Sequence, residues 1–136
     1  MFAVYCLLLE MNRIYVGETP SWRLETRWAE HANPSRGASK WTSKYPPKKK
    51  LCTFKFKTRK ESKAFEGSLV EILMRKYGLD AVRGGNYCMP AEGGTWWVKD
   101  SLRNIPRFTP EFTSECTFSE LRHYGPSRAV ISPRPL

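Results

Sequence analysis

Five side chains in the first half of the chain are of types that could act together in one chemical site. They are Tyr5, Tyr15, Arg27, His31 and Glu66. Cleavage of a phosphodiester bond needs an activated water, a cation that stabilises the equatorial oxygens of the transition state, and help for the leaving oxygen. A single carboxylate is sufficient to hold Mg²⁺ in such a site, because this ion also takes waters and the substrate phosphate as ligands. The set therefore points to metal-assisted hydrolysis of a phosphodiester, with Glu66 as the metal ligand.

The order and spacing of these residues are more informative than any one of them, since a tyrosine in a strand usually has a packing role. Val4-Tyr5-Cys6 is followed by Tyr15-Val16-Gly17, and the two tyrosines are ten positions apart. An Arg-x-x-x-His pattern then follows at Arg27 and His31, and Glu66 comes later. This arrangement resembles the GIY-YIG nuclease superfamily, whose two name-giving tripeptides correspond to the first two segments. Val4 and Cys6 stand where the first tripeptide has Gly and Ile, and apolar strand positions tolerate that exchange.

The resemblance extends from Val4 to Tyr87 and includes two segments typical of compact stand-alone nucleases, Gly37 to Pro47 and Tyr77 to Gly85. It implies a divalent-metal-dependent endonuclease that acts on DNA with Mg²⁺ or Mn²⁺. It also implies roles for the five residues. Tyr5 takes a proton from the attacking water, with Tyr15 beside it, Arg27 steadies the phosphate, His31 supports a tyrosine, and Glu66 holds the metal. Because a phenol with a pKa of about 10 is a poor base at neutral pH, nearby positive charge and an imidazole acceptor would have to favour the phenolate.

The pattern of apolar residues predicts an α/β fold with a small three-stranded antiparallel sheet flanked by helices. A hairpin places Tyr5 and Tyr15 on neighbouring strands, and a capping box at Thr58 and Glu61 opens a long helix that Gly78 closes. Thr19 is expected to cap an earlier helix, with Pro20 at its first position. The expected strands are Phe2 to Leu9, Ile14 to Gly17 and Lys50 to Lys57, and the expected helices run from Pro20 to about His31 and from Thr58 to Gly78.

Two glutamates of the long helix are candidates for the metal ligand. Glu66 shares a stripe with Val70, Leu73 and Tyr77 at the edge of the apolar face, whereas Glu71 is placed to pair with an arginine four residues later on the solvent face. The helical spacing therefore favours Glu66 over Glu71 and does not exclude Glu71.

The net charge of +10 is concentrated in one segment. Residues 36–63 contain eleven basic residues and one acid, while the rest of the chain is neutral. Such a basic surface favours a polyanion, most often nucleic acid, as its partner. A basic face that serves only solubility is the alternative, and a non-catalytic nucleic-acid-binding module that uses this segment is the main rival to an enzyme.

Lysines that alternate with aromatic residues in this segment could bind a nucleic acid strand, with the lysines on phosphates and the aromatic rings on unpaired bases. This predicts a single-stranded or distorted substrate, although a tryptophan such as Trp41 more often packs in the core than stacks on a base. Arg23 is either a phosphate contact or a solvated charge. The candidate contacts are Arg23, Lys40, Trp41, Lys44, Tyr45, Lys48, Lys49 and Lys50.

The four cysteines include no closely spaced pair, so neither a disulfide framework nor a zinc site is expected. The first apolar run is too short to span a bilayer, and no signal peptide precedes it. An intracellular protein, cytoplasmic or nuclear, without a membrane partner is the expectation. The domain is expected over residues 1–88. A Pro/Gly-rich extension of unknown role follows over 89–136, with Trp96 and Trp97 packing on the domain and a short helix from Phe118 to Tyr124.

Overall fold

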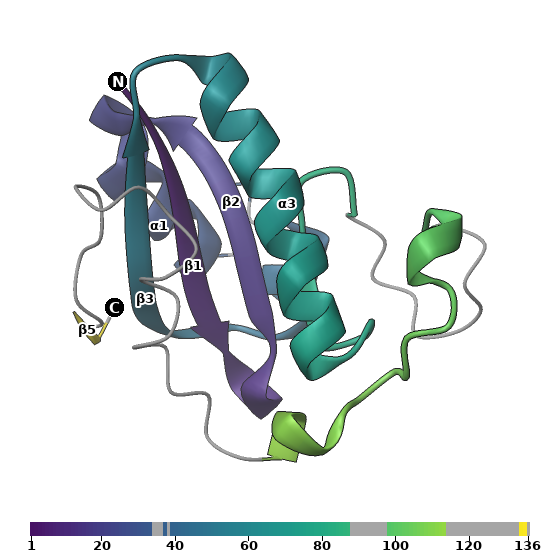
Figure 1. The fold of residues 1–136 in the computed structure, drawn as a ribbon. Coiled ribbons are helices and arrows are strands. Elements are labelled where there is room, and N and C mark those ends of the chain that lie inside the picture. The colour runs from purple at the N-terminus through teal and green to yellow at the C-terminus, as the bar shows by residue number, and fades with distance from the viewer. Residues whose placement is uncertain (34–36, 38, 88–97, 114–133, 136) are drawn as a thin grey trace.

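The computed structural model describes residues 1–33, 37, 39–87, 98–113 and 134–135. Its centre is a sheet with the strand order β4-β2-β1-β3-β5. The three long strands are β1 (Phe2–Leu9), β2 (Ile14–Pro20) and β3 (Pro47–Phe56), and β1 pairs antiparallel with both neighbours (Figure 1). This confirms the predicted antiparallel core. Two short strands extend it, since β4 (Val82–Gly84) runs parallel to β2 and β5 (Arg134–Pro135) runs antiparallel to β3.

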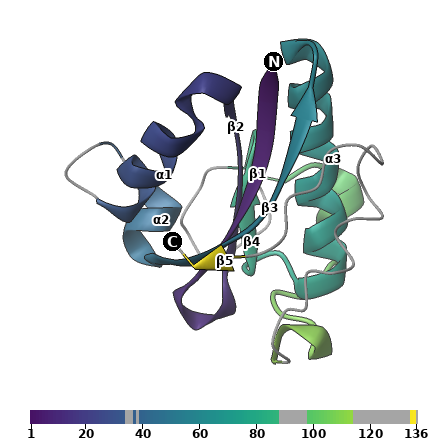
Figure 2. The ribbon, with the colours of Figure 1, turned by 90° about the vertical axis from the view of Figure 1, so that its left-hand side faces the viewer.

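The side chains of β1 alternate between two apolar clusters, one on each face of the sheet. Tyr5 and Leu7 pack on one face with α1 (Leu24–Ala32) and α2 (Lys40–Lys44). Val4 and Cys6 pack on the other face with α3 (Arg59–Tyr77). Figure 2 shows the sheet between these two layers. A strand buried on both faces has to be apolar throughout, which explains the continuous hydrophobic run that the sequence shows here.

The connection from β2 to α1 differs from the prediction. Thr19 does not cap a helix, because β2 continues to Pro20, which pairs with Phe2, and a 3-10 turn, η2 (Ser21–Arg23), leads into α1. The helix ends at Ala32, as expected to within one residue. The prediction of the start was wrong because β1 offers a strand partner as far as Phe2, and these tertiary ladder bonds outweigh a local capping tendency.

The long helix α3 begins and ends where the sequence predicted. The Thr58 hydroxyl accepts a hydrogen bond from the Glu61 amide at 3.2 Å, which satisfies one of the free donors of the first turn. Gly78 follows the last turn with φ of 115°, and a Cβ at this position would overlap the Arg107 carbonyl. Glycine is therefore required here for both its backbone conformation and its size.

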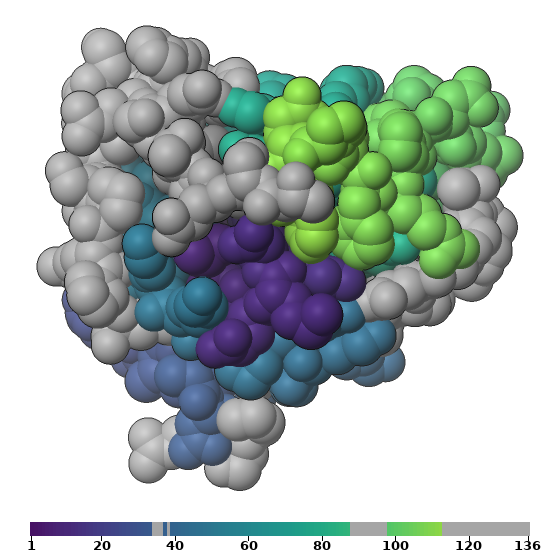
Figure 3. All heavy atoms as spheres, turned by 90° about the horizontal axis from the view of Figure 1, so that it is seen from below, coloured from purple at the N-terminus to yellow at the C-terminus, as the bar shows by residue number. Residues whose placement is uncertain are grey.

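Residues 98–113 contact the domain. Leu102 is buried in the cluster under α3, and the Asn12 amide group donates to the Phe112 carbonyl at 3.3 Å. Figure 3 shows the segment beside the turn between β1 and β2, which contains η1 (Glu10–Asn12). The segment contains two further 3-10 turns, η4 (Asp100–Leu102) and η5 (Pro110–Thr113). The predicted packing of Trp96 and Trp97 and the helix from Phe118 to Tyr124 lie outside the described residues. No helix in the described part of the chain is long and apolar enough to cross a membrane.

Candidate active site

The site forms where β2 loses its outer neighbour. The strand β4 pairs with β2 only from Ile14 to Val16. At Gly17 the described sheet therefore has an open edge. Tyr5, on β1, lies opposite Gly17. The end of its ring lies directly over Gly17, at the place where a Cβ of that residue would be. The absence of a side chain at Gly17 allows the Tyr5 hydroxyl to approach the edge of the sheet.

The Tyr5 hydroxyl is hydrogen bonded to His31. The distance between the hydroxyl oxygen and Nε2 is 2.7 Å, and both side chains are fully buried. On the other side of the imidazole ring, Nδ1 lies 3.0 Å from the hydroxyl of Thr42, which donates to the Ser39 carbonyl at 3.3 Å. The Thr42 hydroxyl also lies 3.0 Å from the Ser39 hydroxyl. When the threonine proton is donated to the Ser39 carbonyl, the proton of His31 lies on Nδ1, and Nε2 accepts from the Tyr5 hydroxyl.

His31 is neutral in this environment. Burial, assisted by the positive charge of Arg27, lowers its pKa from 6.5 to about 3. Burial also raises the pKa of Tyr5 well above its usual value, together with the charge of Tyr15 and against the opposing effect of Arg27. Tyr5 is therefore a protonated donor and His31 an unprotonated acceptor at neutral pH.

Tyr15 and Arg27 complete the α1 side of the site. The ring of Tyr15 lies with its centroid 4.7 Å from that of His31 and 6.3 Å from that of Tyr5. Nη1 of Arg27 donates to the Gly37 carbonyl at 3.0 Å and lies 3.7 Å from Glu30 Oε1. Burial acts to lower the pKa of Arg27, but Tyr5, Tyr15 and Glu30 outweigh it, and the pKa is raised. The site thus contains a permanent cation beside two phenols.

Glu66 approaches the same edge from the opposite face of the sheet. Its side chain is 7% exposed, and a Cβ at Gly85 would be 3.7 Å from its Cγ. Burial raises the pKa of Glu66, while Lys63 and a backbone hydrogen bond from Gly85 oppose that rise. The charge of Glu66 in turn raises the pKa of Tyr5. Glu66 and Tyr5 therefore belong to opposite faces of the sheet and interact electrostatically at its open edge.

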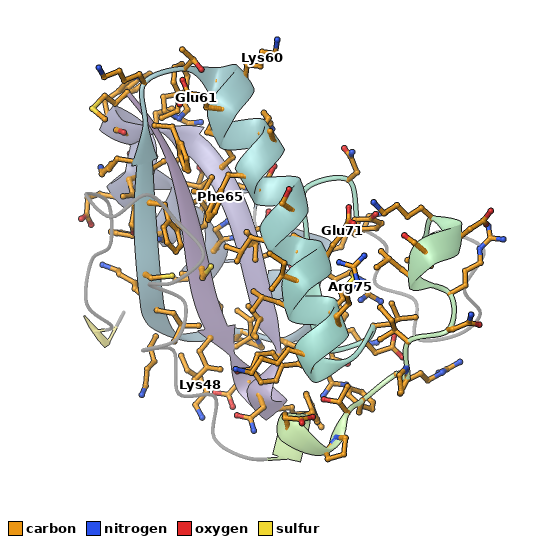
Figure 4. All side chains as sticks on the ribbon, in the orientation of Figure 1. Lys48, Lys60, Glu61, Phe65, Glu71 and Arg75 are labelled. Atoms are coloured by element: carbon orange, nitrogen blue, oxygen red, sulfur yellow. The ribbon has the colours of Figure 1, made fainter. Side chains whose placement is uncertain are left out.

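Glu71 is engaged elsewhere. Its carboxylate lies 2.6 Å from Lys99 Nζ and 3.8 Å from Arg75 Nη2, and it accepts a hydrogen bond of 3.4 Å from the Tyr87 hydroxyl. Figure 4 shows Glu71 and Arg75 on the side of α3 turned toward the segment that carries η4. These contacts give Glu71 a role in holding that segment, and they favour Glu66 as the residue of the site.

The carboxylates at the edge fit a hydrated divalent cation. Lys63 Nζ lies between Glu18 and Glu66, 3.7 Å and 3.9 Å from their Oε1 atoms, so two carboxylates here already share one cation. Among the residues that the structure describes, no three His, Cys, Asp or Glu side chains gather around one point. An ion held wholly by protein ligands therefore lacks support. Mg²⁺ or Mn²⁺ fits better, because Mg²⁺ binds through one or two carboxylates and keeps several waters.

Two predicted contacts to nucleic acid are corrected. Trp41 is 1% exposed and its indole nitrogen donates to the Ile14 carbonyl at 3.1 Å, while Tyr45 is 7% exposed with the Arg13 guanidinium over its ring. Neither ring has a free face for a base. Both lie in the apolar cluster between the sheet and the helices α1 and α2, because a short helix needs large apolar side chains to attach it to a sheet.

The charged candidates lie at different places on the surface. Lys40, Lys44, Lys48 and Lys49 are exposed. Lys50 lies over the Trp28 ring, 4.0 Å from its centroid, and 3.9 Å from Glu25, while Arg23 is bound to Glu30 at 3.3 Å. Figure 4 shows Lys48 and Lys60 at opposite ends of the molecule. The lysines around Lys48 and the cations around Lys60 therefore lie on different parts of the surface.

Thr42 is a site residue that the sequence did not reveal. It is fully buried on α2, and the Ser39 hydroxyl caps this helix by accepting from the Thr42 amide at 3.1 Å. A serine followed three residues later by a threonine signals only a helix start. The contact between Thr42 and His31 spans eleven residues of sequence and exists only in the folded chain. Glu18, which Ser62, Arg59 and Lys63 hold beside Glu66, was missed for the same reason.

We expect Thr42→Val to disturb His31, whereas Thr42→Ser leaves it intact. Valine has nearly the same shape but no hydroxyl, so the buried Nδ1 proton loses its acceptor at a cost of about 1–3 kcal/mol. Urea unfolding measures the loss of stability, and ¹⁵N NMR of the imidazole reports the tautomer. An unchanged tautomer in Thr42→Val would show that Thr42 does not orient the ring.

Acid should destabilise the protein through His31. Because the pKa is lowered in the fold from 6.5 to about 3, the unfolded chain binds the proton first. The free energy of unfolding should therefore fall as pH decreases from 6.5 toward 3, with a slope that approaches about 1.4 kcal/mol per pH unit. The raised pKa of Glu66 acts in the opposite direction, since its contribution is complete below 4.5 and is lost as pH rises. His31→Asn should flatten the fall measured by urea unfolding between pH 6.5 and 4.5. An equal slope in both proteins would contradict a neutral His31.

A family model described as the GIY-YIG catalytic domain matches residues 1–77. This is more than half of the 136 residues and includes all five candidate residues. Comparisons with curated proteins and with solved structures give no match. The matched range contains the three long strands and all three α-helices. Because the family model matches more than half of the chain, the chain belongs to the GIY-YIG nuclease family.

Proposed function

We propose that this protein is an endonuclease that hydrolyses phosphodiester bonds in DNA with the help of a divalent metal ion. Membership of the family supports a nuclease-type function in general. The observation that carries the finer proposal is the 2.7 Å hydrogen bond between Tyr5 and His31 at the open edge of the sheet. A phenol with a proton acceptor on one side, and with Arg27 and Glu66 acting on it electrostatically, has the groups that hydrolysis of a phosphate diester needs.

Arg27 is the residue that binds the phosphate in this proposal. Its guanidinium is always charged and is 23% exposed, so a phosphate can reach it from solvent. The bonds to the Gly37 carbonyl and to Glu30 fix its direction before the substrate arrives. A cation held in advance at the position where negative charge develops contributes to catalysis without reorganisation during the reaction.

The Tyr5–His31 pair carries the proton of the attacking water. Tyr5 takes that proton as its own hydroxyl proton passes to Nε2 of His31, so a free phenolate, which its raised pKa disfavours, need not accumulate. Arg27 lowers the pKa of His31 in the free protein. A phosphate bound to Arg27 offsets this positive charge and raises the proton affinity of the imidazole. Binding of the substrate therefore activates the base.

Glu66, assisted by Glu18, is the carboxylate that would hold Mg²⁺ or Mn²⁺. Such an ion, when bound, supplies positive charge for the phosphate oxygens and lowers the pKa of a bound water. The side chains of Glu18 and Glu66 are 2% and 7% exposed. Burial of two carboxylates is unfavourable unless cations compensate it, and in the free protein Lys63 and Arg59 provide that compensation.

A non-catalytic nucleic-acid-binding module is the second candidate, supported by the net charge of +10. Such a module needs its lysines but gains nothing from a buried carboxylate near the bound phosphate, since that charge would repel the ligand. Glu66 therefore distinguishes the two candidates.

Glu66→Gln should abolish cleavage and leave DNA binding unchanged or tighter, because the amide keeps the shape but cannot replace an anionic metal ligand. The assay follows labelled single-stranded and duplex DNA with Mg²⁺, with Mn²⁺ and with chelator. Glu71→Gln is the matched control on the same helix and should cut like the wild type. Binding without cutting by the wild type under all conditions would favour the binding module, and substantial cutting by Glu66→Gln would remove this residue from the site.

Replacing Lys48, Lys49 and Lys50 by alanine should weaken DNA binding and reduce its salt dependence. We expect a loss of about two units of slope in a plot of log affinity against log salt, about 0.9 per phosphate contact, because Lys50 is held over Trp28. The charge-matched control replaces Lys99, Arg103 and Arg107, half-exposed cations of the segment 98–113. An unchanged slope in the first variant would mean that its surface faces away from the nucleic acid.

A further inference from the structure

We propose that Trp22 is a stacking platform for an unpaired base of the nucleic acid, beside the active site. The inference rests on the proposed nuclease function and names the form of substrate that the site takes. Trp22 is 82% exposed, the highest value among the large hydrophobic side chains of the described residues. Tryptophan is usually well buried, so an indole exposed to this degree at the rim of a site is typical of a surface that binds a partner.

The backbone beneath the indole is fixed. Trp22 is the middle residue of η2, and the Ser21 amide donates to the Met1 carbonyl at 2.9 Å. The Leu24 amide closes the turn on the Ser21 carbonyl. The indole is therefore presented from an anchored turn. A rigid aromatic side chain loses little conformational entropy when a base stacks on it.

Trp22 lies within reach of the strand that would be cut. Pro20, the end of β2, is three residues beyond Gly17, or about 10 Å at the rise of a β-strand. A nucleic acid strand advances about 3.4 Å per stacked nucleotide, so about three nucleotides span this distance. In the residues that follow Trp22, Arg23 and Arg27 share the Oε1 atom of Glu30, at 3.3 Å and 3.7 Å. This cationic pair continues from the turn of Trp22 to the phosphate site.

Exposed cations outnumber exposed acids around Trp22, which favours a nucleic acid as the partner. Glu25, three residues later, is 78% exposed, but its carboxylate lies 3.9 Å from Lys50 Nζ. Arg59 lies over the Phe2 ring, 5.1 Å from its centroid, and Phe2 pairs with Pro20 beside η2. The side chains of Arg59 and Lys63 are 53% and 56% exposed, whereas that of Glu18 is 2% exposed. Figure 1 shows the end of β2 and the start of α3 at the same end of the molecule.

An unpaired base is the occupant because only such a base has a free face. Aromatic rings among cations bind single strands without sequence preference in this way, whereas the bases of an intact duplex are stacked on one another. The burial of Trp41 and Tyr45 excludes them from this role. The site should therefore prefer a strand that is unpaired within a few nucleotides of the cleaved bond.

Binding in chelator, which prevents metal-dependent cutting, tests this. Affinities of the wild type, Trp22→Ala and Trp22→Phe are measured for a single-stranded oligonucleotide and for a blunt duplex of the same sequence. Trp22→Ala should weaken single-strand binding about 5- to 100-fold, Trp22→Phe should retain much of it, and duplex binding should change less than about 2-fold. Met11→Ala, at an apolar position 68% exposed in the turn between β1 and β2, should change neither affinity.

An equal loss on both ligands, or no loss on either, would overturn the proposal. Thermal unfolding of the variants excludes misfolding as the cause, since an exposed indole contributes little to the core. The nuclease function is decided separately by the metal-dependent cutting that Glu66→Gln should abolish. If cutting holds and Trp22→Ala binds like the wild type, only the stacking platform is wrong. If nothing is cut and Trp22→Ala still loses single-strand affinity, the platform stands and the enzyme does not.

Discussion

The site depends on the phenol of Tyr5, which lies over the backbone of Gly17 and is hydrogen bonded to His31. Tyr5 is on the central strand, where every position from Ala3 to Leu9 is at most 3% exposed. Its hydroxyl can therefore take part in a site only if the side chain extends along the sheet to its edge. The missing side chain at Gly17 provides the path, and the hydrogen bond of 2.7 Å to His31 fixes the end of the phenol. Tyr15 and Arg27 lie around this bond because β2 and α1 follow directly in the chain. The position of the catalytic tyrosine candidate is therefore set by the buried central strand of the sheet.

The second constraint is the early end of β4. This strand pairs with β2 only as far as Val16. Side chains from both faces of the sheet can therefore approach each other at the next residue, Gly17. Glu66, from the layer of α3, acts there on a phenol that belongs to the layer of α1. A longer β4 would separate them. At the same open edge, Glu18 lies within reach of Arg59 and Lys63, so these cations compensate the charge of the carboxylates.

In the free protein, the electrostatics of the site make His31 a weak proton acceptor. Burial holds Tyr5 protonated and His31 neutral, and Arg27 adds to the low pKa of His31. The lowered pKa of His31 costs stability only in acid, whereas the buried polar groups need complete partners at any pH. Thr42 and Ser39 supply those partners through the hydroxyl network. The arrangement is typical of functional sites, where strongly perturbed pKa values collect in a few contacting residues.

The sequence by itself determined the three long strands and the cap and end of α3, because these depend on local periodicity and on glycine and threonine at fixed positions. From spaced motifs it also singled out Tyr5, Tyr15, Arg27, His31 and Glu66 as candidates for one site. It misplaced the start of α1, where pairing of Pro20 with Phe2 outweighs a local cap. Only the tertiary structure decided the hydrogen-bond partners of His31, the burial of Trp41 and Tyr45, and the placement of Lys48 and Lys60 at opposite ends of the molecule. Each of these depends on contacts between residues far apart in the chain, as between Thr42 and His31 or Trp41 and Ile14. Composition and periodicity do not encode which side chain fills a given gap or which end of a strand a charge occupies in space.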